Sequence, residues 1–431
     1  MVLQNMLNGI RVIFQNMIYK EIKKCRVCGN ENLRTVIDLG NMYLTGFFPK
    51  PGEVIDSSPL DLVKCWDEGV GKCCGLVQLR HTYDLGTMYG DNYGYRSGLN
   101  ASMVKHLYDL VKEVESRVQL NDGDLVIDIA SNDGTLLGGY VNQNAQLVGI
   151  DPTAAKFKEY YRNNITIVPE FFSSKLITSR FKEKAKVITS VAMFYDLEDP
   201  IKFMEDIKEI LANDGLWVIE QSYMPFMIEN TSYDTICHEH IEYYGLAQID
   251  WMVKKVGLKI VDVDFNNANG GSFRVTMAQA TSAYKENVEK IQKILNEEKA
   301  NGYDEWPIYH KFAEMTKKHK EDLIQLLTKL KLSGKKIFGY GASTKGNVIL
   351  QYCNFGLDFI PAIAEVNEYK YGRLTPGTNI PIISEEEAKK LNPDYLLVLP
   401  WHFRENTIMR EHDYLNHNGH LIFPLPKIEI V

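Results

Sequence analysis

Two acidic residues, Asp128 and Asp151, stand 23 positions apart, and each closes or ends a short apolar run. The first run continues into the polar turn Ser131-Asn132-Asp133-Gly134-Thr135. A polar turn at the carboxyl end of the first strand is where doubly wound parallel sheets bind ligands. An acidic residue about 20 positions beyond such a turn can accept hydrogen bonds from both hydroxyls of a ribose. The spacing therefore predicts a cofactor that contains a nucleoside.

The composition of this turn separates two classes of cofactor. A pyrophosphate needs close approach of the backbone and hence a G-x-G-x-x-G loop, whereas this turn has one glycine and two acids. S-adenosylmethionine has no phosphate but carries a sulfonium and an amino group, which carboxylates and amides suit. The turn therefore favours S-adenosylmethionine over a nicotinamide cofactor, although the acid on the second strand would suit either. We expect it to be bound by Asp128, Ser131, Asn132, Asp133, Gly134 and Asp151.

Seven cysteines are present, and five of them fall within the first 75 residues. The start of the chain, residues 1–24, lacks the continuous apolar core of a signal peptide, so we expect a leader or an extra helix there. Clustered cysteines without a secretion signal indicate a metal site rather than a disulfide framework. Residues 25–85 are too few, and too rich in turns, to build a large core, so a metal would stabilise this unit.

Strands and helices alternate along the middle of the chain, which predicts a parallel, doubly wound sheet. The last two strands of this part flank Asn269-Gly270-Gly271, a hairpin type of turn. The strands expected are 125–130, 146–150, 165–168, 186–190, 216–220, 259–265 and 272–279. The helices expected are 101–118, 154–163, 201–211 and 248–256.

A second α/β pattern occupies the C-terminal part of the chain. Residues 281–333 are charged and helical in period, and we expect one or two connecting helices there. The following strands are predicted at 336–340, 360–364, 395–399 and 420–423. The first of these runs into a glycine-rich turn, Gly341 to Gly346, and then into a helix, which is a ready phosphate site. Asn347 follows this turn where a P-loop requires lysine, so we do not expect an NTPase.

The order of several motifs resembles that of the sugar C-methyltransferases of deoxysugar biosynthesis. These proteins combine a small zinc-binding domain, a methyltransferase core and a C-terminal Rossmann-like domain. The similarity covers nearly all of the chain from Cys25 onward. It is carried by Cys25-Arg26-Val27-Cys28-Gly29, Cys74 to Leu79, Tyr93-Gly94-Tyr95-Arg96-Ser97-Gly98, Ser131 to Leu136, Tyr233 to His240 and Gly339 to Gly346.

The resemblance completes the metal site. Two thiolates spaced as in Cys25-x-x-Cys28 bind one face of a tetrahedral zinc ion, and a second pair closes it. The family places that pair just before Gly-Leu-Val-Gln, which implies Cys65 and Cys74, with Cys73 as an alternative to Cys74. Four thiolates leave no open position on the metal, so the zinc would be structural.

The resemblance also implies how the reaction is catalysed. A ketone acidifies the neighbouring C–H bond of a sugar, and a base that removes this proton gives an enolate carbon that attacks the methyl group. A neutral histidine is suited to this task. The family pattern implies His240 as the base, Glu239 as its partner, with His238 beside them and with Tyr93 or Tyr95 lining the sugar pocket.

Two departures from the family lie near the expected substrate. Cys237 stands where the family commonly has a tyrosine, and Met193-Phe194-Tyr195-Asp196 replaces a stretch that contains histidine. They leave open which sugar is methylated and at which atom. On a strand, His238 and His240 would share a face, but no third ligand is apparent beside them, so a metal site at His238-Glu239-His240 is disfavoured.

The C-terminal domain is implied to hold the nucleotide diphosphate of the substrate. Ser343 and Lys345 in the glycine-rich turn are candidates, and so are Asn367 and Lys370 beyond the next strand. A purely structural role for this loop remains the alternative.

The sequence thus predicts an α/β protein with a Rossmann-like class I methyltransferase core, a small N-terminal zinc-binding domain and a C-terminal Rossmann-like domain. The boundaries expected are 1–24, 25–85, 86–280 and 281–431. The net charge of −8 argues against nucleic acid as a partner, no apolar run is long enough to cross a membrane, and we expect a cytoplasmic enzyme without an obligate protein partner. Alternative functions are an O- or N-methyltransferase on a related sugar or glycan precursor, a NAD-dependent sugar-nucleotide oxidoreductase, and a zinc-dependent interaction protein with an inactive core.

Overall fold

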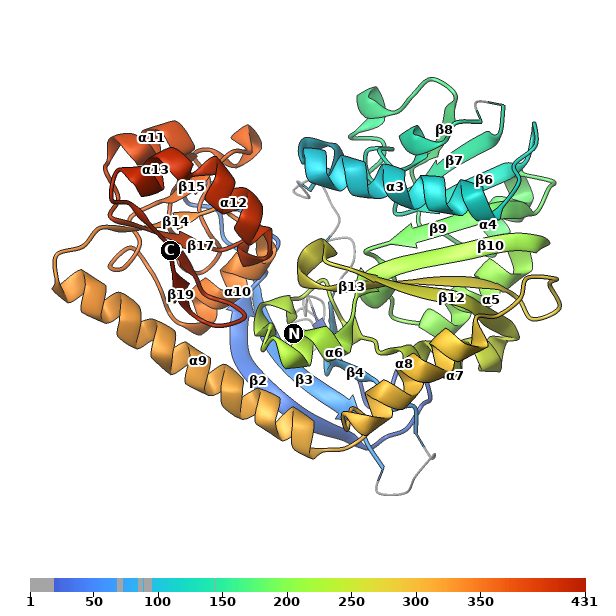
Figure 1. The fold of residues 1–431 in the computed structure, drawn as a ribbon, viewed down its shortest axis with the longest axis horizontal. Coiled ribbons are helices and arrows are strands. Elements are labelled where there is room, and N and C mark those ends of the chain that lie inside the picture. Colours follow the sequence, from blue (N-terminus) through green and yellow to red (C-terminus); the bar gives the residue numbers. More distant parts are fainter. Residues whose placement is uncertain (1–18, 68–72, 84–87, 89–94, 143) are drawn as a thin grey trace, which may run out of the picture.

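The computed structural model describes the chain except residues 1–18, 68–72, 84–87, 89–94 and 143. Three units follow one another along the sequence (Figure 1). A curved N-terminal sheet, drawn in blue, lies between a central α/β unit in cyan and green and a C-terminal α/β unit in orange and red. The expected leader or helix at residues 1–24 falls mostly outside the described residues. Tyr19–Glu21, which is described, forms the strand β1.

The central unit contains a seven-stranded sheet with the order β12-β13-β10-β9-β6-β7-β8. All neighbouring pairs are parallel except those of β13, which is antiparallel to both β10 and β12. This is the class I methyltransferase arrangement, so the predicted fold class of the core is confirmed. The strands are β6 (Leu125–Ile129), β7 (Gln146–Ile150), β8 (Ile165–Val168), β9 (Ala185–Val191), β10 (Leu211–Ser222), β12 (Leu258–Asn266) and β13 (Ser272–Gln279).

Helices cover both faces of this sheet, which is why β6 can be buried at all five positions. The helix α5 begins directly after Asp199, whose side chain accepts a hydrogen bond from the amide of Lys202, and Pro200 occupies its first turn. The helices of this unit are α3 (Ala101–Arg117), α4 (Ser174–Arg180), α5 (Pro200–Ile210), α6 (Met224–Glu229) and α7 (Leu246–Val256).

The helix predicted at 154–163 is wrong, because this segment forms tight turns with a single 3-10 turn at Lys158–Tyr160. Asp151 accepts hydrogen bonds from the amide and hydroxyl of Thr153 and so fixes the start of the segment. At its end, Tyr161 is buried and bonds the Ser131 hydroxyl and the Asn132 carbonyl. These tertiary contacts override a moderate helix propensity.

The N-terminal unit has more regular structure than its turn-rich sequence suggests. Its four-stranded sheet has the order β11-β4-β3-β2, and β1 pairs separately with β5. The strand β11 comes from the central unit and pairs with β4 through Glu242 and Tyr243. The strands are β2 (Leu33–Tyr43), β3 (Ser57–Cys65), β4 (Val77–Leu79), β5 (His81–Tyr83) and β11 (Glu242–Tyr243).

The C-terminal unit has a six-stranded sheet with the order β16-β15-β14-β17-β18-β19, parallel except for the last pair. It is Rossmann-like, as predicted. Its strands are β14 (Ile337–Tyr340), β15 (Ile363–Glu365), β16 (Ile382–Ser384), β17 (Tyr395–Val398), β18 (His420–Phe423) and β19 (Glu429–Ile430). Its helices are α10 (Thr344–Tyr352), α11 (Glu385–Lys390), α12 (Arg404–Arg410) and α13 (His412–Asn416), and the predicted connection contains two helices, α8 (Val288–Ala300) and α9 (Pro307–Leu332).

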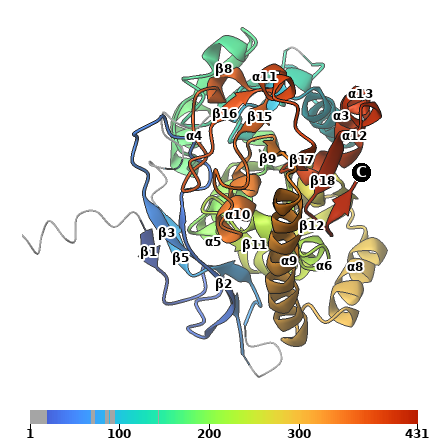
Figure 2. The same cartoon turned by 90° about the vertical axis from the view of Figure 1, so that its left-hand side faces the viewer.

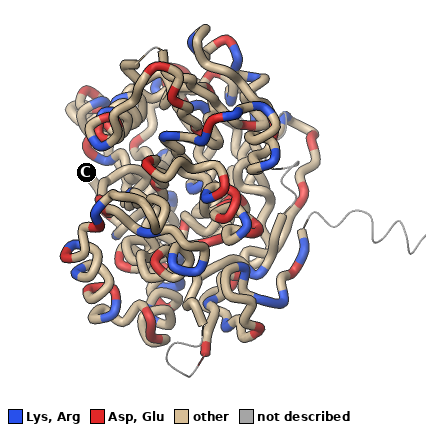
Figure 3. The backbone as a smooth tube through the Cα atoms, turned by 90° about the vertical axis from the view of Figure 1, so that its right-hand side faces the viewer, with Lys and Arg blue, Asp and Glu red and all other residues tan. Residues whose placement is uncertain are grey.

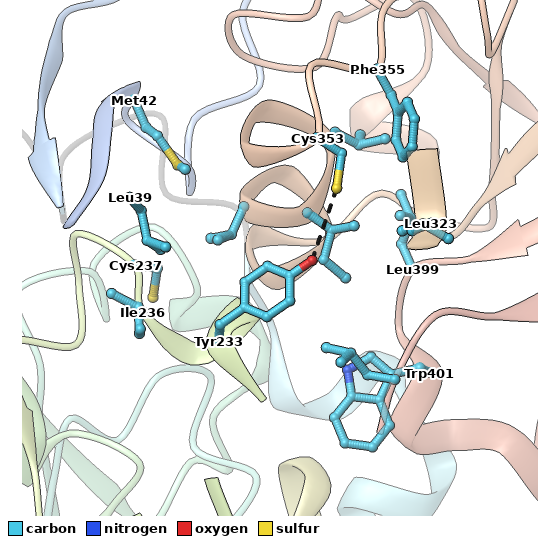
Figure 4. Close-up of a cluster of buried hydrophobic side chains, with 14 of the residues drawn as sticks. Leu39, Met42, Tyr233, Ile236, Cys237, Leu323, Cys353, Phe355, Leu399 and Trp401 are labelled. Carbon is cyan, nitrogen blue, oxygen red and sulfur yellow. Dashed lines mark hydrogen bonds between the residues drawn. The ribbon is translucent and has the colours of Figure 1, made fainter. Parts of the chain in front are cut away.

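A shared hydrophobic core ties the C-terminal unit to the N-terminal sheet. The long helix α9 contacts β2, α6 and β14 (Figures 1 and 2). Figure 4 shows Tyr233 of the central unit between Leu39 and Met42 on one side and Cys353 and Leu399 on the other. Because one apolar cluster includes side chains from all three units, we treat them as parts of one packed molecule.

Candidate functional site

A cavity of about 380 Å³ opens at the carboxyl ends of β6, β7 and β9 in the central unit. Five carboxylates line it, from Asp128, Asp151, Glu170, Asp196 and Glu220. No lysine, arginine or histidine is among the described residues that line it. Such a wall attracts a cation and repels a phosphate. These carboxylates therefore suit the sulfonium and amino group of S-adenosylmethionine better than the phosphates of a dinucleotide.

The turn after β6, at the ligand edge of the sheet, has a strained backbone. Ala130 and Asn132 adopt positive φ angles of 59° and 51°, which non-glycine residues rarely do. Gly134 has φ of 75°, and a Cβ added there would lie 2.7 Å from the ring of Tyr161. The amide of Asn132 donates to Asp151 Oδ2 at 2.9 Å. The second acid thus holds the turn as well as lining the cavity.

The six predicted cofactor residues divide into two groups. Asp128, Ser131, Asn132 and Asp151 line the cavity. Asp133 is turned toward the segment that precedes α3, where it accepts from the amide of Gly98 at 3.0 Å and lies 3.5 Å from Arg96 Nε. Gly134 is also outside the lining.

Asp128 is buried at the floor of the cavity and accepts a hydrogen bond from Thr189 Oγ1 at 2.5 Å. Burial raises the pKa of its carboxyl to about 7 because the charged form is poorly solvated there. A bound cation would favour the ionised form.

Glu220 at the end of β10 was missed by sequence reasoning. Burial raises its pKa, but the hydrogen bond with His106 and the charge of Arg274 outweigh this, so that the pKa lies below its ordinary value. Arg274 Nε donates to Glu220 Oε2 at 2.8 Å, and Asn266 Nδ2 does so at 3.0 Å. Its place at the carboxyl end of a central strand is the one signal that could have revealed it.

Tyr95 lies at the mouth of the cavity with half of its surface exposed, 51%. Its carbonyl accepts from Asn132 Nδ2 at 3.0 Å, and the amide of Ser97 donates to Asn132 Oδ1 at 3.0 Å. These bonds hold the segment before α3 over the cofactor turn. Tyr93 lies outside the described residues.

The structure gives the three residues of His238-Glu239-His240 different surroundings. His238 is 1% exposed, packs edge-on against Tyr83, and lies within 3.4 Å of Thr45 and of the Ser58 carbonyl. Burial lowers its pKa to about 4. These contacts are all with the N-terminal unit, away from the main cavity.

His240 is held by the carbonyl of Thr235, 3.2 Å from its Nδ1, and by the ring of Tyr195 at 4.2 Å. Burial and the nearby charge of Lys345 lower its pKa to about 3, so the ring is neutral. A carbonyl only accepts hydrogen bonds, so the Nδ1 atom carries the proton and Nε2 carries the lone pair. Nε2 is therefore the nitrogen at which this imidazole can accept a proton.

Glu239 points toward the N-terminal unit. A Cβ added at Gly46 would overlap its carboxylate, and that position is 3.7 Å from Thr344 Oγ1. Burial raises the pKa of Glu239, and its Oε2 has no hydrogen-bond partner among the described residues. The expected bond between Glu239 and His240 is not present; the Thr235 carbonyl orients the imidazole instead.

Candidates in the C-terminal unit surround the turn after β14. Ser343 caps α10 by accepting from the Gly346 amide at 3.0 Å. Lys370 donates to the Ala342 carbonyl at 2.7 Å, and Asn367 accepts from the Tyr369 amide at 3.1 Å. Lys345, in contrast, bonds to the central unit, where its Nζ donates to the carbonyl of Asn269 at 2.7 Å.

The four thiols predicted to bind zinc come together. The sulfur atoms of Cys25 and Cys74 are 3.5 Å apart, as are those of Cys28 and Cys65, and all four lie within 4.8 Å of one another. Tetrahedral zinc with bonds of about 2.3 Å places its sulfur ligands at about 3.8 Å from one another. The site fits a structural zinc ion, and Cys73, whose sulfur faces the carbonyl of Cys65, is outside it.

Comparisons with known proteins find family matches in three parts of the chain. Family models match as a proposed zinc-binding domain at residues 25–89, a methyltransferase domain at 103–263 and a C-methyltransferase C-terminal domain at 267–426. The C-methyltransferase NovU of Streptomyces niveus is 30% identical over 422 residues, which are 96% of this chain and 98% of that protein.

Solved structures with a similar fold are distant. A S-adenosylmethionine-dependent methyltransferase from Clostridium acetobutylicum is 12% identical, covering 41% of this chain and 92% of that one, with a TM-score of 0.32. The CcbJ methyltransferase of Streptomyces caelestis is 14% identical, covering 40% and 89%, with a TM-score of 0.32.

The seven-stranded sheet, the acid-lined cavity and the methyltransferase domain define a class I enzyme that depends on S-adenosylmethionine. The C-terminal match and the full-length relative narrow this further. The chain belongs to the C-methyltransferase family that includes NovU.

Proposed function

We propose that this enzyme methylates a carbon atom of a nucleotide-linked keto-deoxysugar. The observation that carries the proposal is the neutral His240, whose proton sits on Nδ1 and whose Nε2 is free to act as a base. Transfer to carbon needs such a base, whereas transfer to an amine depends on it far less. The relative named a C-methyltransferase supports the same acceptor atom.

When bound, S-adenosylmethionine supplies an electrophilic methyl group. In our proposal, Asp151 binds the ribose hydroxyls, and Ser131 and Asn132 border the cofactor. Asp128 contributes negative charge toward its cationic end. Phe171 and Phe172 provide apolar wall area suited to the adenine ring. Asp133 and Gly134 act by shaping the turn.

The reaction begins with removal of a proton from the carbon beside the acceptor carbonyl. His240 Nε2 takes that proton, and the Thr235 carbonyl stabilises the resulting imidazolium through Nδ1. We propose that Glu239, whose pKa burial raises, lies beside an oxygen of the acceptor, and that His238 positions this segment against the N-terminal unit. Tyr95, and Tyr93 beside it, would border the sugar.

The C-terminal unit would hold the nucleotide. Ser343, Asn367 and Lys370 lie around the turn after β14, and the N-terminus of α10 adds donors for a diphosphate. We propose the units 25–85, 86–280 and 281–431 as the working division, with β11 as a strand of the central unit lent to the N-terminal sheet.

The substrate in this proposal is a small molecule and not nucleic acid, which agrees with a net charge of −8 and with lysines, arginines and acids interspersed over the face in Figure 3. Among the described residues, no helix is long and apolar enough to span a membrane. We propose a cytoplasmic location, because a nucleotide-linked sugar and four reduced thiols belong there.

Two measurements test the proposal. Calorimetric titration with S-adenosylmethionine, and separately with NAD, should give binding of the first alone, since the acid-lined cavity disfavours a pyrophosphate. Turnover of nucleoside-diphosphate 4-keto-6-deoxyhexoses should give a new C–CH₃ signal by NMR.

His240→Ala should lower methyl transfer at least 100-fold while the affinity for S-adenosylmethionine stays within twofold. An O- or N-methylated product, or a His240→Ala variant that keeps most of its activity, would contradict transfer to carbon. Binding of NAD alone would favour the oxidoreductase alternative.

A further inference from the structure

The C-terminal sheet has its own ligand edge. Its chain runs from β14 to β15 on one side and reaches β17 and β18 on the other, so β14 and β17 flank the topological switch point. Ligands of such sheets bind outside the carboxyl ends of the strands at this point. The two loops touch there, since a Cβ added at Gly341 would lie 2.7 Å from the Pro400 ring. Lys345 and His402 follow these loops.

This edge faces the central unit and not solvent. Lys345 Nζ donates to the Asn269 carbonyl at 2.7 Å, and Asn269 lines the cofactor cavity. A Cβ added at Gly270 would lie 3.3 Å from the Trp401 ring and 3.6 Å from His402. Trp401 Nε1 donates to Asp234 Oδ2 at 2.7 Å. The loops at the ligand edge of the C-terminal sheet therefore contact Asn269 and Gly270, and Asn269 lines the cavity at the ligand edge of the central sheet.

Two polar groups at this meeting point lack full partners. In the described part of the chain, the Asn269 carbonyl is the one hydrogen-bond acceptor found for Lys345, although an ammonium group has three donors. His402 Nδ1 is shielded from solvent and bonds to no described residue. Buried polar atoms are almost always paired, so both groups point to a missing ligand.

The positive charge of Lys345 is close enough to His240, the proposed base, to affect its pKa. Burial lowers the pKa of His240 and that of His402, and the charge of Lys345 adds to this effect, so that each lies at about 3. Trp401, which follows the second loop, belongs to the apolar cluster of Figure 4. Burial lowers the pKa of Lys345, so its ammonium lies in a poorly solvated region. A positive charge in such a region stabilises a nearby oxyanion strongly.

We propose that Lys345 is a catalytic residue that binds the carbonyl oxygen of the acceptor sugar, and that His402 Nδ1 bonds a hydroxyl of the same ring. The inference rests on the proposed function. The electron pair of the C–H bond forms a C=C bond while its proton passes to His240 Nε2. The carbonyl oxygen becomes an enolate oxygen beside the Lys345 ammonium. The enolate carbon then bonds the methyl carbon, the pair of the former S–C bond stays on sulfur, and the carbonyl re-forms.

This role differs from binding the diphosphate, which is what the family resemblance implies for Lys345. Ser343, Asn367 and Lys370 keep the proposed role in binding the nucleotide, and Lys370 donates to the Ala342 carbonyl in the turn after β14. Lys345 instead donates to the carbonyl of Asn269, a residue that lines the cavity proposed for the methyl donor. In this proposal, Lys345 therefore acts at the reacting carbon and not at the phosphates.

Proton transfer can be measured without methyl transfer. The enzyme is incubated in D₂O with S-adenosylhomocysteine and a nucleoside-diphosphate 4-keto-6-deoxyhexose, one with thymine and one with guanine as base. Deuterium entering the carbon beside the carbonyl is followed by NMR. The variants are Lys345→Met, Lys345→Arg and, as a control, Lys335→Met, which removes an exposed lysine paired with Asp394 in the same unit.

Wild type and Lys335→Met should exchange equally fast. Lys345→Met should exchange about 100- to 1,000-fold more slowly, and Lys345→Arg should recover most of the rate. His402→Gln should raise the KM for the sugar more than it lowers kcat. The affinity of each variant for S-adenosylhomocysteine, measured by calorimetry, should stay within twofold of wild type, which shows that the fold is kept.

Exchange by Lys345→Met at the wild-type rate would overturn this inference, and a raised KM alongside it would return Lys345 to the diphosphate. Absence of exchange in wild type with either sugar would instead overturn the proposed function, and this inference with it. The two failures are thus distinguished by the wild-type enzyme.

Discussion

Asp151 uses both oxygens of its carboxylate inside the protein before any ligand binds. One oxygen accepts from the Asn132 amide, and the other accepts from the amide and hydroxyl of Thr153. A carboxylate has about four acceptor positions, so it retains capacity toward the cavity. The same side chain can therefore shape the cofactor turn and bind a ribose.

Asp151→Ala should weaken binding of S-adenosylmethionine about 100-fold. Charge-assisted hydrogen bonds contribute about 1.5–3 kcal/mol each, and the loss also releases the turn. Calorimetry measures the affinity. The matched control is Asp122→Ala, an exposed acid bonded to Asn144, which should leave the affinity unchanged. Equal affinity of Asp151→Ala and wild type would remove Asp151 from the cofactor site.

At the scale of elements, adjacent cysteines at the end of one loop have different positions. Cys74 Sγ lies 3.5 Å from Cys25 Sγ, whereas Cys73 Sγ faces the carbonyl of Cys65. The direction of each side chain decides which one can complete the tetrahedron. Sequence spacing alone left this choice open.

Cys74→Ser should lose bound zinc and lower the melting temperature, because the energy of metal binding contributes to folding. Cys73→Ser should retain one zinc per chain and melt close to wild type. Atomic absorption gives the metal content, and circular dichroism gives the melting curve. A chelator that removes no metal from wild type and leaves its melting curve unchanged would contradict a structural zinc site.

The sequence predicted elements best where their signal was local. The strands β7, β8, β13 and β18 match their predicted bounds, because short apolar runs between polar turns determine them. The strand β11 has two residues, and its partner β4 lies about 160 positions earlier, so no local pattern reveals it. Likewise, the cofactor turn was readable as a motif, while the bonds from Glu220 to Arg274 and from Lys345 to Asn269 depend on tertiary packing.

At the scale of the whole molecule, one buried and two half-buried histidines lie near contacts between the units: His238, and then His240 and His402. Burial lowers the pKa of His238 to about 4 and those of His240 and His402 to about 3. In the unfolded chain, the histidine pKa values are about 6.5. At a pH between the folded and unfolded pKa values, the unfolded chain therefore binds more protons than the folded chain. Stability is therefore complete above about pH 6.5 and falls as the pH is lowered toward 4.

Between pH 6.5 and 5, each of these histidines should contribute a loss of about 2 kcal/mol in the free energy of unfolding. Urea unfolding at a series of pH values, with excess zinc present, measures the slope. His402→Gln should reduce that slope by about one proton, whereas His412→Gln, which changes an exposed histidine, should not. A slope that His402→Gln leaves unchanged would contradict a lowered pKa of His402.

The strand that completes the N-terminal sheet has a consequence for synthesis on the ribosome. The edge of β4 is made early, but β11, which covers it, emerges only after Glu242. At about 5–20 residues per second, that edge stays open for roughly ten to thirty seconds in a nascent chain. An uncovered edge strand invites pairing with other chains. The four cysteines of the zinc site precede β4 in the chain, so binding of zinc before β11 is made would stabilise this unit during the interval.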